Sequence, residues 1–560
     1  MQSGSVTVPH NGWQFRNLQV LRWNMSMVKY IGIRFAGVLA VFLSAVLVSC
    51  ATSNPRSPAQ DGLTGSGIDA LVASVMKDYN VAGMAVAVVK DGTVIHEKGY
   101  GFRDINGPER ISPTTIFKIA SNSKAFTTAA IARLVDDGLL SWDDAVVDIL
   151  PEFKMYDPYV TREFTVRDLL THRSGLGTGS GDLMLWPEPN QFTRTDIIRA
   201  QRHFKPATSF RSAYSYDNTL YVVAGEIVSK ISSLSFEEYV DSKIMEPIGL
   251  ETCFAGQVPD SVLANAAKPH SLADSGLYIV DRGIINNEPV TSVAAGGIRC
   301  SLHDMIDWVQ THMAGGIAPN GARIFSSAQS QEMWRPHTLI PLTDRRREMD
   351  SSNFYAYALG WRVADTHGHF KVSHTGALAG FRSVVEIIPS LDLAVIVLLN
   401  TGNSDARRAV ATTILQSYMD IAQQDWVSLL KPDRTEPDEQ SGVGSANIVP
   451  GRVDFSRDHY AGTYSDPWFG EVDISVNRDT GALDIVSRKS PKLDGVLIPL
   501  RDNMFAVYWH DRSLEGDAFI HFELDPDNRV TGARMARMYP DQDTSFNYQD
   551  LNFMKIDKRD

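Results

Sequence analysis

Cysteine is scarce in this chain, which holds only three residues of that type in 560. They are Cys50, Cys253 and Cys300, and none of them belongs to a Cys-x-x-Cys pattern. No His-Glu-x-x-His pattern occurs either, so a structural zinc site or a zinc-protease helix is not expected. His367 and His369 form an isolated His-x-His before a strand, where such side chains are more often solvated or packed than metal-bound. We therefore expect no metal ion or other cofactor, and the sequence leaves open whether Cys253 and Cys300 pair.

An excess of basic residues is absent as well. The formal net charge is -13, with 53 Lys and Arg against 66 Asp and Glu. Binding to a phosphate backbone requires clustered Lys and Arg, so the charge argues against a nucleic-acid partner. The composition is that of a globular protein, and the chain is too long for one ordinary core, which predicts two or three domains.

A long apolar run near the N-terminus, from Phe35 to Val48, follows two basic residues and ends in Leu47-Val48-Ser49-Cys50. Such a charged, apolar and small-residue sequence is typical of a bacterial export signal. Its ending resembles a lipobox, which would leave Cys50 as the lipidated first residue of the mature protein. The next residue is Ala51 rather than Asp, which resembles lipoproteins sorted to the outer membrane. We expect residues 1–50 to be an extension with a lipoprotein-type signal on an exported, periplasmic protein anchored to the outer membrane. An ordinary cleaved signal or a single anchor helix is the alternative.

Composition divides the rest of the chain into two domains. We expect a polar linker at 51–65, a large domain at 66–425, a linker rich in Pro, Asp, Glu, Gly and Ser at 426–455, and a β domain at 456–560. In the last segment, short alternating runs with turn residues between them predict a small all-β barrel or sandwich. No nucleophile-and-base pattern occurs there, so we assign it no chemistry.

Apolar runs predict two antiparallel strand pairs in the large domain. The runs 84–89 and 93–96 are separated by Asp-Gly, which is typical of a hairpin turn. The runs 383–388 and 393–399 are separated by Pro-Ser-Leu-Asp, another turn sequence.

Helix signals lie between these strand pairs. A long helix is expected to begin near Ser121 and to stop at Asp137-Gly138. Thr165-Val166-Arg167-Asp168 and Ser301-Leu302-His303-Asp304 each match the capping-box pattern that opens a helix.

The four residues Ser121-Asn122-Ser123-Lys124 place a serine and a lysine one helical turn apart. Residues at i and i+3 share a helix face, so the Lys124 amine can lie beside the Ser121 hydroxyl and help to remove its proton. The helix N-terminus also favours developing negative charge. Taken singly, Ser121 fits a helix N-cap and Lys124 a solvated helix face.

Two later motifs supply partners for this pair. Tyr216 offers a phenol that can lose or relay a proton near a cationic lysine, and Asn218 can bond Lys124 or a substrate amide. In His374-Thr375-Gly376, the last two residues would lie on a strand that lines the site, where glycine permits close approach. Taken singly, Tyr216 fits a core aromatic residue and the histidine a buried strand residue.

In this order, the three motifs resemble those of the penicillin-binding-protein-like serine hydrolases. That family includes class C β-lactamases, D-alanyl-D-alanine carboxypeptidases, D-aminopeptidases and family VIII carboxylesterases. Supporting stretches are Lys98-Gly99-Tyr100-Gly101, Val166-Arg167-Asp168-Leu169-Leu170-Thr171-His172 and Ala295-Gly296-Gly297. The resemblance covers about residues 66 to 420 and implies an α+β fold, with a β-lactamase-like antiparallel sheet flanked by helices and a helical subdomain. The tail from Tyr460-Ala461-Gly462-Thr463-Tyr464 resembles an appended lipocalin-like domain.

The resemblance also implies roles for the site residues. Ser121, Lys124 and Tyr216 would be catalytic, and the backbone N–H groups of Ser121 and Ala377 would form the oxyanion hole. The residues expected to contact substrate or line that hole are Asn218, His374, Thr375, Gly376 and Ala377. Many β-lactamases have a lysine where this chain has His374, and a largely neutral histidine weakens the case for a carboxylate of an antibiotic as ligand.

We therefore expect a serine hydrolase that cleaves amide bonds of short peptides through a Ser121 acyl-enzyme. The alternatives are a carboxylesterase with the same site, or a penicillin-binding protein that acylates without turnover. A small peptide or ester is the expected partner, with membrane contact only through the N-terminal segment.

Two other features are assigned to loops. The glycine-rich stretch 175–181 misses strict G-x-G-x-x-G spacing and follows a helix, so it predicts a loop near the cleft rather than a nucleotide site. Glu188 lies between two prolines, and a class A deacylating glutamate belongs with a Ser-Asp-Asn motif that this chain lacks.

Overall fold

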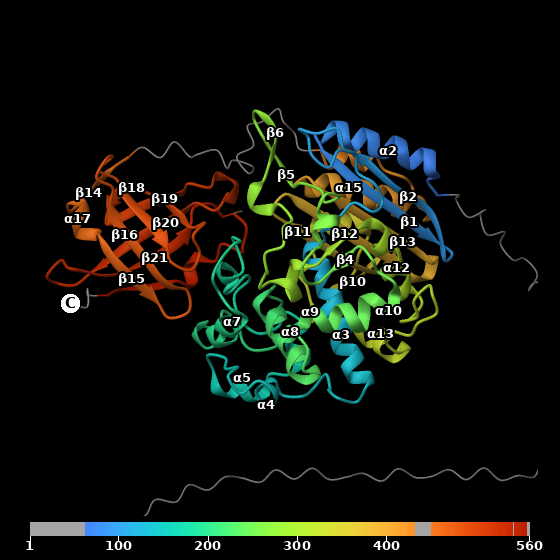
Figure 1. The fold of residues 1–560 in the computed structure, drawn as a ribbon, viewed down its shortest axis with the longest axis horizontal. Helices are drawn as coiled ribbons and strands as arrows, with labels where there is room; N and C mark the ends of the chain where they lie inside the picture. The colour runs from blue at the N-terminus through green and yellow to red at the C-terminus, as the bar shows by residue number, and fades with distance from the viewer. Residues whose placement is uncertain (1–61, 432–449, 541, 557–560) are drawn as a thin grey trace, which may run out of the picture. The chain divides into compact units, whose positions relative to one another are not determined.

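The structure is a computed structural model that describes residues 62–431, 450–540 and 542–556. The predicted export signal, Cys50 and residues 51–61 of the predicted linker lie outside the described residues. Within the described ranges, no helix is long and apolar enough to cross a membrane. These ranges fall in one compact unit, which is built from a large α+β domain and a small β domain (Figure 1).

An eight-stranded antiparallel sheet forms the centre of the large domain, in the order β2-β1-β13-β12-β11-β10-β9-β8. The predicted hairpin and the predicted second strand pair are confirmed as β1–β2 and β12–β13. The strands are β1 (Gly83–Lys90), β2 (Thr93–Gly101), β8 (Thr338–Leu339), β9 (Tyr355–Tyr357), β10 (Arg362–Thr366), β11 (His369–Leu378), β12 (Phe381–Ile388) and β13 (Leu393–Leu399).

Both faces of the sheet are covered by helices. One face carries α2 (Gly65–Asp78), α15 (Ser404–Ser417) and α16 (Trp426–Leu429), and the other carries α3 (Ser123–Asp136) and α12 (Leu302–Met313). Successive side chains of a strand point to opposite faces, so Val86 and Val88 pack with α2 and α15 while Ala85 and Ala87 face α3 and α12. The central strands are therefore apolar throughout.

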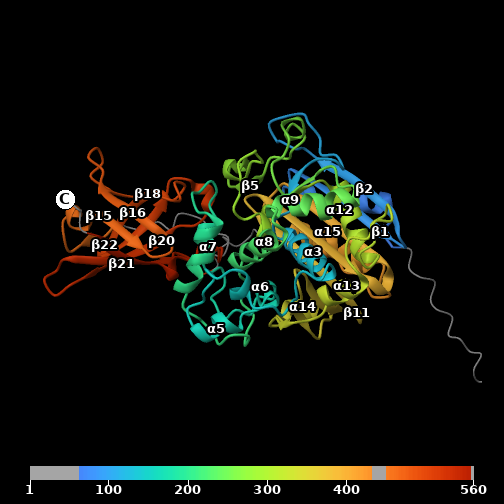
Figure 2. The same ribbon diagram turned by 60° about the horizontal axis from the view of Figure 1, so that its bottom comes forward.

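Helix α3 is the centre of the helical part of the domain. It is almost wholly buried, because small residues such as Ala125, Ala129 and Ala130 let its neighbours approach closely. Figure 2 shows α3 beside α8 (Thr219–Ser232), with which it is in contact. The remaining helices are α4 (Val146–Ile149), α5 (Pro158–Glu163), α6 (Val166–Leu170), α7 (Arg194–Ala200), α9 (Phe236–Val240), α10 (Glu246–Ile248), α11 (Asp260–Leu263), α13 (Ser327–Met333) and α14 (Asp344–Asp350).

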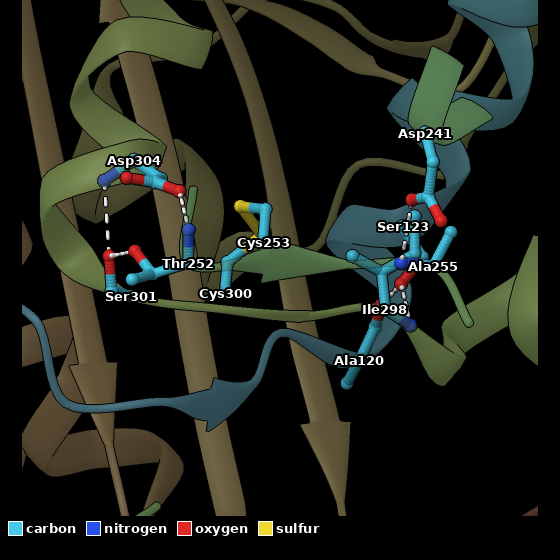
Figure 3. Close-up of a disulfide and its surroundings, with 10 residues drawn as sticks. All are labelled: Ala120, Ser123, Asp241, Thr252, Cys253, Ala255, Ile298, Cys300, Ser301 and Asp304. Carbon is cyan, nitrogen blue, oxygen red and sulfur yellow. Dashed lines mark hydrogen bonds between the residues drawn. A yellow bond between two sulfur atoms is a disulfide. The ribbon is translucent and has the colours of Figure 1, made fainter. Parts of the chain in front are cut away.

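A three-stranded sheet leads the chain into α3. It consists of β3 (Phe117–Lys118), β7 (Arg299–Cys300) and β4 (Cys253–Phe254), in the order β3-β7-β4. Cys253 and Cys300 lie directly opposite each other on β4 and β7 and form a disulfide (Figure 3). The structure thus settles the pairing that the sequence left open.

The two predicted capping boxes have different outcomes. At α6, the Thr165 hydroxyl accepts from the Asp168 N–H while the Asp168 carboxylate accepts from the Thr165 N–H, so this box is confirmed. At α12, Ser301 accepts from the Asp304 N–H as predicted, but the Asp304 carboxylate accepts from the N–H of Thr252 (Figure 3). The second half of that box is wrong, because Asp304 ties α12 to the segment before β4.

The C-terminal domain is a closed barrel of eight strands, since β18 pairs with both β17 and β19. Its interior is aromatic, with the rings of Tyr460, Tyr464, Phe505 and Phe522 in contact. The predicted small β barrel is confirmed. The strands are β15 (Gly462–Asp466), β16 (Gly470–Val476), β17 (Leu483–Ser487), β18 (Asp494–Asp502), β19 (Met504–Trp509), β20 (Ala518–Leu524), β21 (Val530–Arg537) and β22 (Asn552–Ile556), and a short β14 (Arg452–Val453) adds to β18.

The large domain continues past the predicted boundary at residue 425. Trp426 is buried against the α2–α15 layer, and its Nε1 donates to Gln416 Oε1 over 2.8 Å. The Tyr79 hydroxyl donates to the Val427 carbonyl oxygen over 2.7 Å. The first residues of the predicted linker 426–455 therefore belong to the large domain, and residues 432–449 lie outside the described ranges.

Removing the disulfide should destabilise the large domain. We expect a Cys253→Ala/Cys300→Ala variant to lose roughly 2–4 kcal/mol of unfolding free energy, because the bond constrains unfolded chain across a separation of 47 residues. Urea unfolding followed by circular dichroism measures the difference. Dithiothreitol should lower the midpoint of the oxidised wild type and leave that of the variant unchanged. Equal unfolding midpoints for the wild type and the variant, each with and without dithiothreitol, would contradict the expectation.

Candidate active site

Ser121 lies in a tight turn, Ala120–Asn122, that leads into α3. Ala120 has φ of +49°, a left-handed conformation uncommon for a residue with a Cβ, and such strain gathers at functional sites. The hydroxyl of the following Ser123 donates to the Ala120 carbonyl oxygen over 2.7 Å and accepts from Ile298 N–H over 3.1 Å, which fixes the turn (Figure 3). The helix begins two residues after Ser121, whose side chain is left partly exposed.

Lys124 is fully buried one turn further along. Its Nζ lies 3.3 Å from Ser121 Oγ and 2.7 Å from both Asn218 Oδ1 and the Ala295 carbonyl oxygen. Burial lowers the pKa of Lys124 well below its ordinary value, against an opposing effect of Asp182. In the neutral amine, two N–H groups serve the two carbonyl oxygens, which leaves the lone pair for the Ser121 hydroxyl. The arrangement is that of a general base beside a nucleophile.

Tyr216 covers the lysine from the other side. Its ring centroid lies 4.8 Å from Lys124 Nζ and 4.1 Å from the ring of His172. Burial raises the pKa of Tyr216 to about 12, whereas Arg362 and the Ser121 hydroxyl act to lower it. The Tyr216 hydroxyl lies near the Ser121 hydroxyl, although their geometry is not that of an ordinary hydrogen bond. It has no other hydrogen-bond partner among the described residues. The raised pKa favours the neutral phenol, which lies beside Ser121 and can donate its proton there.

Strand β11 forms one wall, and its alternation separates the predicted residues. Thr375 and Ala377 border the cleft, while His374 and Gly376 are buried on the other side of the strand. His374 Nε2 lies 3.0 Å from the hydroxyl of Tyr357, and burial lowers the pKa of His374 well below its ordinary value. The expected contact between His374 and substrate needs correction: neighbouring side chains on a strand face opposite ways, so His374 reaches the site only through Tyr357.

Gly376 allows the strand to approach the nucleophile turn. A Cβ at this position would lie 2.3 Å from both the Ile119 carbonyl oxygen and Ser383 Oγ. Since real Cβ atoms do not come so close, only glycine fits here, as the sequence motif predicted.

Arg362 is a site residue that the sequence motifs did not indicate. It lies on β10 opposite Ser373 of β11, and its Nη1 donates to Thr375 Oγ1 over 3.2 Å. Its Cζ is 5.4 Å from the ring centroid of Tyr216. Within the described part of the chain, tyrosines rather than carboxylates surround it, and it borders the cleft. The fixed positive charge that His374 lacks is thus supplied by the neighbouring strand, and only the register of β10 on β11 could have revealed it.

Asp182 is the second residue that sequence reasoning missed. Asn218 uses both ends of its amide: Oδ1 accepts from Lys124, and Nδ2 donates to Asp182 Oδ2 over 2.8 Å. Asp182 is buried, and burial raises its pKa well above the ordinary value. The signal for it was its place just after the glycine-rich stretch 175–181, which lies beside the cleft as predicted.

The site opens into a cleft of about 1930 Å³. Ser121, Tyr216, Asn218, Arg362, Thr375 and Ala377 line its base, so the structure brings together all predicted residues except His374, with Lys124 and Gly376 directly behind. Trp186, Pro187 and the hairpin of β5 (His270–Ala273) and β6 (Gly276–Ile279) form walls. The barrel adds residues 512–515 and 542–546 to the lining, a contribution that its sequence did not indicate.

Glu188 and the histidine pair have other partners. Glu188 lies in the loop between the turn at Asp182 and α7, as predicted, where it forms an ion pair with buried Lys118 over 3.8 Å. His367 contacts the Met349 carbonyl oxygen, and His369 contacts Ser390 Oγ. Among the described residues, no three His, Cys, Asp or Glu side chains are placed to hold a metal ion.

A family model described as Beta-lactamase matches residues 68–418, and one described as a domain of unknown function (DUF3471) matches residues 455–555. Unguisins hydrolase of Aspergillus campestris is 26% identical over 374 residues, which cover 64% of this chain and 67% of that protein. Penicillin-binding protein 4 of Amycolatopsis lactamdurans is 25% identical over 327 residues, which cover 58% of this chain and 82% of that protein.

A solved structure shares the fold over a longer range. The octameric penicillin-binding protein homologue from Pyrococcus abyssi superposes with a TM-score of 0.57 at 20% identity, over 88% of this chain and 99% of that one. The expected β-lactamase-like α+β fold followed by a small barrel is therefore confirmed. Because the Beta-lactamase model spans more than half of the sequence, the chain belongs to the Beta-lactamase family.

Proposed function

We propose that this protein is an exported serine hydrolase that cleaves amide bonds of short peptides through an acyl-enzyme on Ser121. The observation that carries the proposal is an accessible serine hydroxyl 3.3 Å from the buried amine of Lys124. Two relatives support it by name, an unguisins hydrolase and a penicillin-binding protein.

Acylation would use the groups at the base of the cleft. Ser121 Oγ attacks the substrate carbonyl carbon while Lys124 takes its proton, because burial lowers the pKa of this amine and so favours its neutral form. The backbone N–H groups of Ser121 and Ala377, both of which border the cleft, would hold the oxyanion. Tyr216 gives its proton to the leaving amine and regains one from Lys124. Water then attacks the acyl-enzyme, and the same groups return the proton to Ser121.

Arg362 favours a substrate with a carboxylate near the scissile bond. A guanidinium forms paired hydrogen bonds with a carboxylate, and among the described residues Arg362 has no carboxylate partner. It lies beside Thr375, whose hydroxyl it already orients. We infer that the peptide is cut close to a free C-terminus. The argument against a carboxylate ligand that rested on His374 alone is therefore offset by the charge of Arg362.

The same site would accept other acyl donors. An ester needs less help with its leaving group, so a carboxylesterase is the second candidate. A stable acyl-enzyme without turnover, as in a penicillin-binding protein, is the third. Turnover measurements separate the three.

Export is supported by the disulfide between Cys253 and Cys300, because such bonds persist in oxidising compartments. The signal features of residues 1–50 point the same way. We propose a periplasmic location with a lipid anchor at Cys50 in the outer membrane.

Ser121→Ala should abolish turnover without unfolding the protein, because it removes only a hydroxyl. Lys124→Ala and Tyr216→Phe should each lower kcat roughly a thousandfold or more, as when one member of a catalytic unit is removed. Intact-mass spectrometry after incubation with a peptide library or p-nitrophenyl esters reports both products and any adduct on Ser121. Ester turnover without peptide cleavage would favour the esterase, and an adduct without products the stalled enzyme. Full activity of Ser121→Ala would remove the assignment.

Arg362→Gln should lower kcat/KM for a peptide with a free C-terminus about 10- to 100-fold more than for its C-terminal amide, since a charged hydrogen-bonded contact is lost. The ratio of the two substrates is the measurement, because Arg362 also influences Tyr216. Arg382→Gln is a matched control: it removes another arginine that borders the cleft, and it should leave the ratio unchanged. An equal loss on both substrates in Arg362→Gln would exclude carboxylate recognition.

If Cys50 carries a lipid anchor, a labelled fatty acid fed to bacteria that express the protein should become attached to it. The labelled protein should then be found in the outer-membrane fraction. Cys50→Ser should lose the label and release a soluble or uncleaved form. Mass spectrometry of the mature N-terminus measures the modification. A wild-type protein cleaved at another residue, without lipid, would refute the anchor and leave export intact.

A further inference from the structure

The glycine-rich stretch 175–181 connects the barrel to the catalytic lysine. At its end, Asp182 accepts from Asn218 Nδ2, and Asn218 Oδ1 accepts from Lys124. The same stretch supports Tyr216, since Gly179 N–H donates to the Tyr216 carbonyl oxygen over 2.9 Å. Its conformation therefore fixes two residues of the proposed mechanism, although it contributes no reacting group.

The barrel contacts this stretch directly. Ser180 is buried, and its hydroxyl donates to Asp550 Oδ2 of the barrel over 3.0 Å. Gly179 has φ of +76°, and a Cβ there would lie 2.4 Å from the Thr544 carbonyl oxygen, so the two backbones touch. Asp550 is itself oriented, because its Oδ2 also accepts from Asn547 Nδ2 over 2.7 Å.

Aromatic contacts hold the barrel against the large domain near this point. The rings of Phe204 and Trp468 lie 5.1 Å apart, and those of Phe192 and Phe469 lie 5.6 Å apart. Phe204 also packs on Gly181, where a Cβ would lie 2.6 Å from its ring. The stretch is thus enclosed between the barrel and the large domain.

We propose that the C-terminal barrel is a positioning element of the active site, acting from Asp550 through Ser180, Asp182 and Asn218 on Lys124. The inference rests on the proposed serine-hydrolase function. Asn218 can hold Lys124 only with its carbonyl oxygen turned towards the amine, and the bond from its Nδ2 to Asp182 selects that orientation over the flipped one. Proton transfer between Ser121 and Lys124 depends on a geometry that a small displacement of this chain of contacts would disturb.

The test follows the rate at which Ser121 of the full-length protein reacts with a fluorophosphonate probe. In this reaction the Ser121 Oγ–P bond forms, the P–F bond breaks, fluoride leaves, and the serine proton passes to Lys124. The rate constant reports the positioning of the base, and the final labelled fraction, measured by intact-mass spectrometry, reports how much protein is folded. The two readouts separate positioning from loss of structure.

We expect Ser180→Ala and Asp550→Ala each to label completely, but with a rate constant roughly tenfold below that of the wild type. The double variant should label no more slowly than either single variant, because both changes remove the same Ser180–Asp550 hydrogen bond. Asp182→Ala should be slower by about a hundredfold, since Asn218 is then free to flip. Asp182→Asn and Asp550→Asn each keep an acceptor oxygen, so they should restore most of the rate.

Lys489→Met is the matched control for the interface. Lys489 of the barrel also bridges the two domains, through Asp196 over 3.0 Å, but it does not contact the stretch 175–182. Its loss should leave the labelling rate unchanged. A Ser180→Ala variant that labels at the wild-type rate would overturn the proposal, and so would incomplete labelling at an unchanged rate, which shows only a folding role. Asp182→Asn as slow as Asp182→Ala would also overturn it.

Failure of the underlying function gives a different result. A wild-type protein that takes no label, or a Ser121→Ala variant that takes as much, would refute the serine-hydrolase function itself. If wild type labels at Ser121 and the Ser180 and Asp550 variants behave like wild type, only the role of the barrel is rejected.

Discussion

The burial of the Lys124 amine is the constraint on which the rest of the site depends. A cationic lysine is costly in a water-free interior, so burial favours the neutral form that can accept a proton. The amine is tolerable there only because oxygens of Ser121, Asn218 and Ala295 surround it. These residues come from three separate parts of the chain, and the mutual packing of α3, α8 and the helical turn Val293–Gly297 brings them together. The packing that forms the core of the helical part therefore also positions the site residues.

The sheet places the positive charge of Arg362, from β10, beside a part of the cleft wall that β11 leaves without a charge. Strand β11 turns Thr375 and Ala377 towards the cleft and His374 away from it, so the histidine has no direct access to a ligand. Arg362 occupies the corresponding space from β10 and keeps its positive charge beside Tyr216. Arg362 borders the cleft without a carboxylate partner among the described residues, which is the basis for proposing an anionic group on the substrate. The same side chain also acts to lower the pKa of the Tyr216 phenol, so under the proposed function it would act on both the substrate and the phenol.

The small barrel takes part in the architecture of the cleft. It lines the cleft with residues 512–515 and 542–546, and it touches the stretch that carries Asp182. Glycine at position 179 is needed for this contact, both for its positive φ and because a Cβ would meet the Thr544 backbone. Hydrogen bonds thus connect an appended domain, through Ser180, Asp182 and Asn218, to the buried Lys124.

Local chemistry in the sequence determined the strand pairs, the confirmed Thr165 cap, the barrel and two short spacings, Ser121 with Lys124 and Tyr216 with Asn218, whereas the meeting of these two pairs was decided by tertiary structure. The local features follow from alternation, turn residues and short spacings, which act over a few residues. Arg362, Asp182 and the inward turn of His374 were decided by tertiary structure, because they depend on the register of β10 on β11 and on the packing of a loop. The disulfide and the part of the barrel in the cleft belong to the same group. Contacts between residues distant in the chain leave no periodic pattern in it, so only the folded protein reveals them.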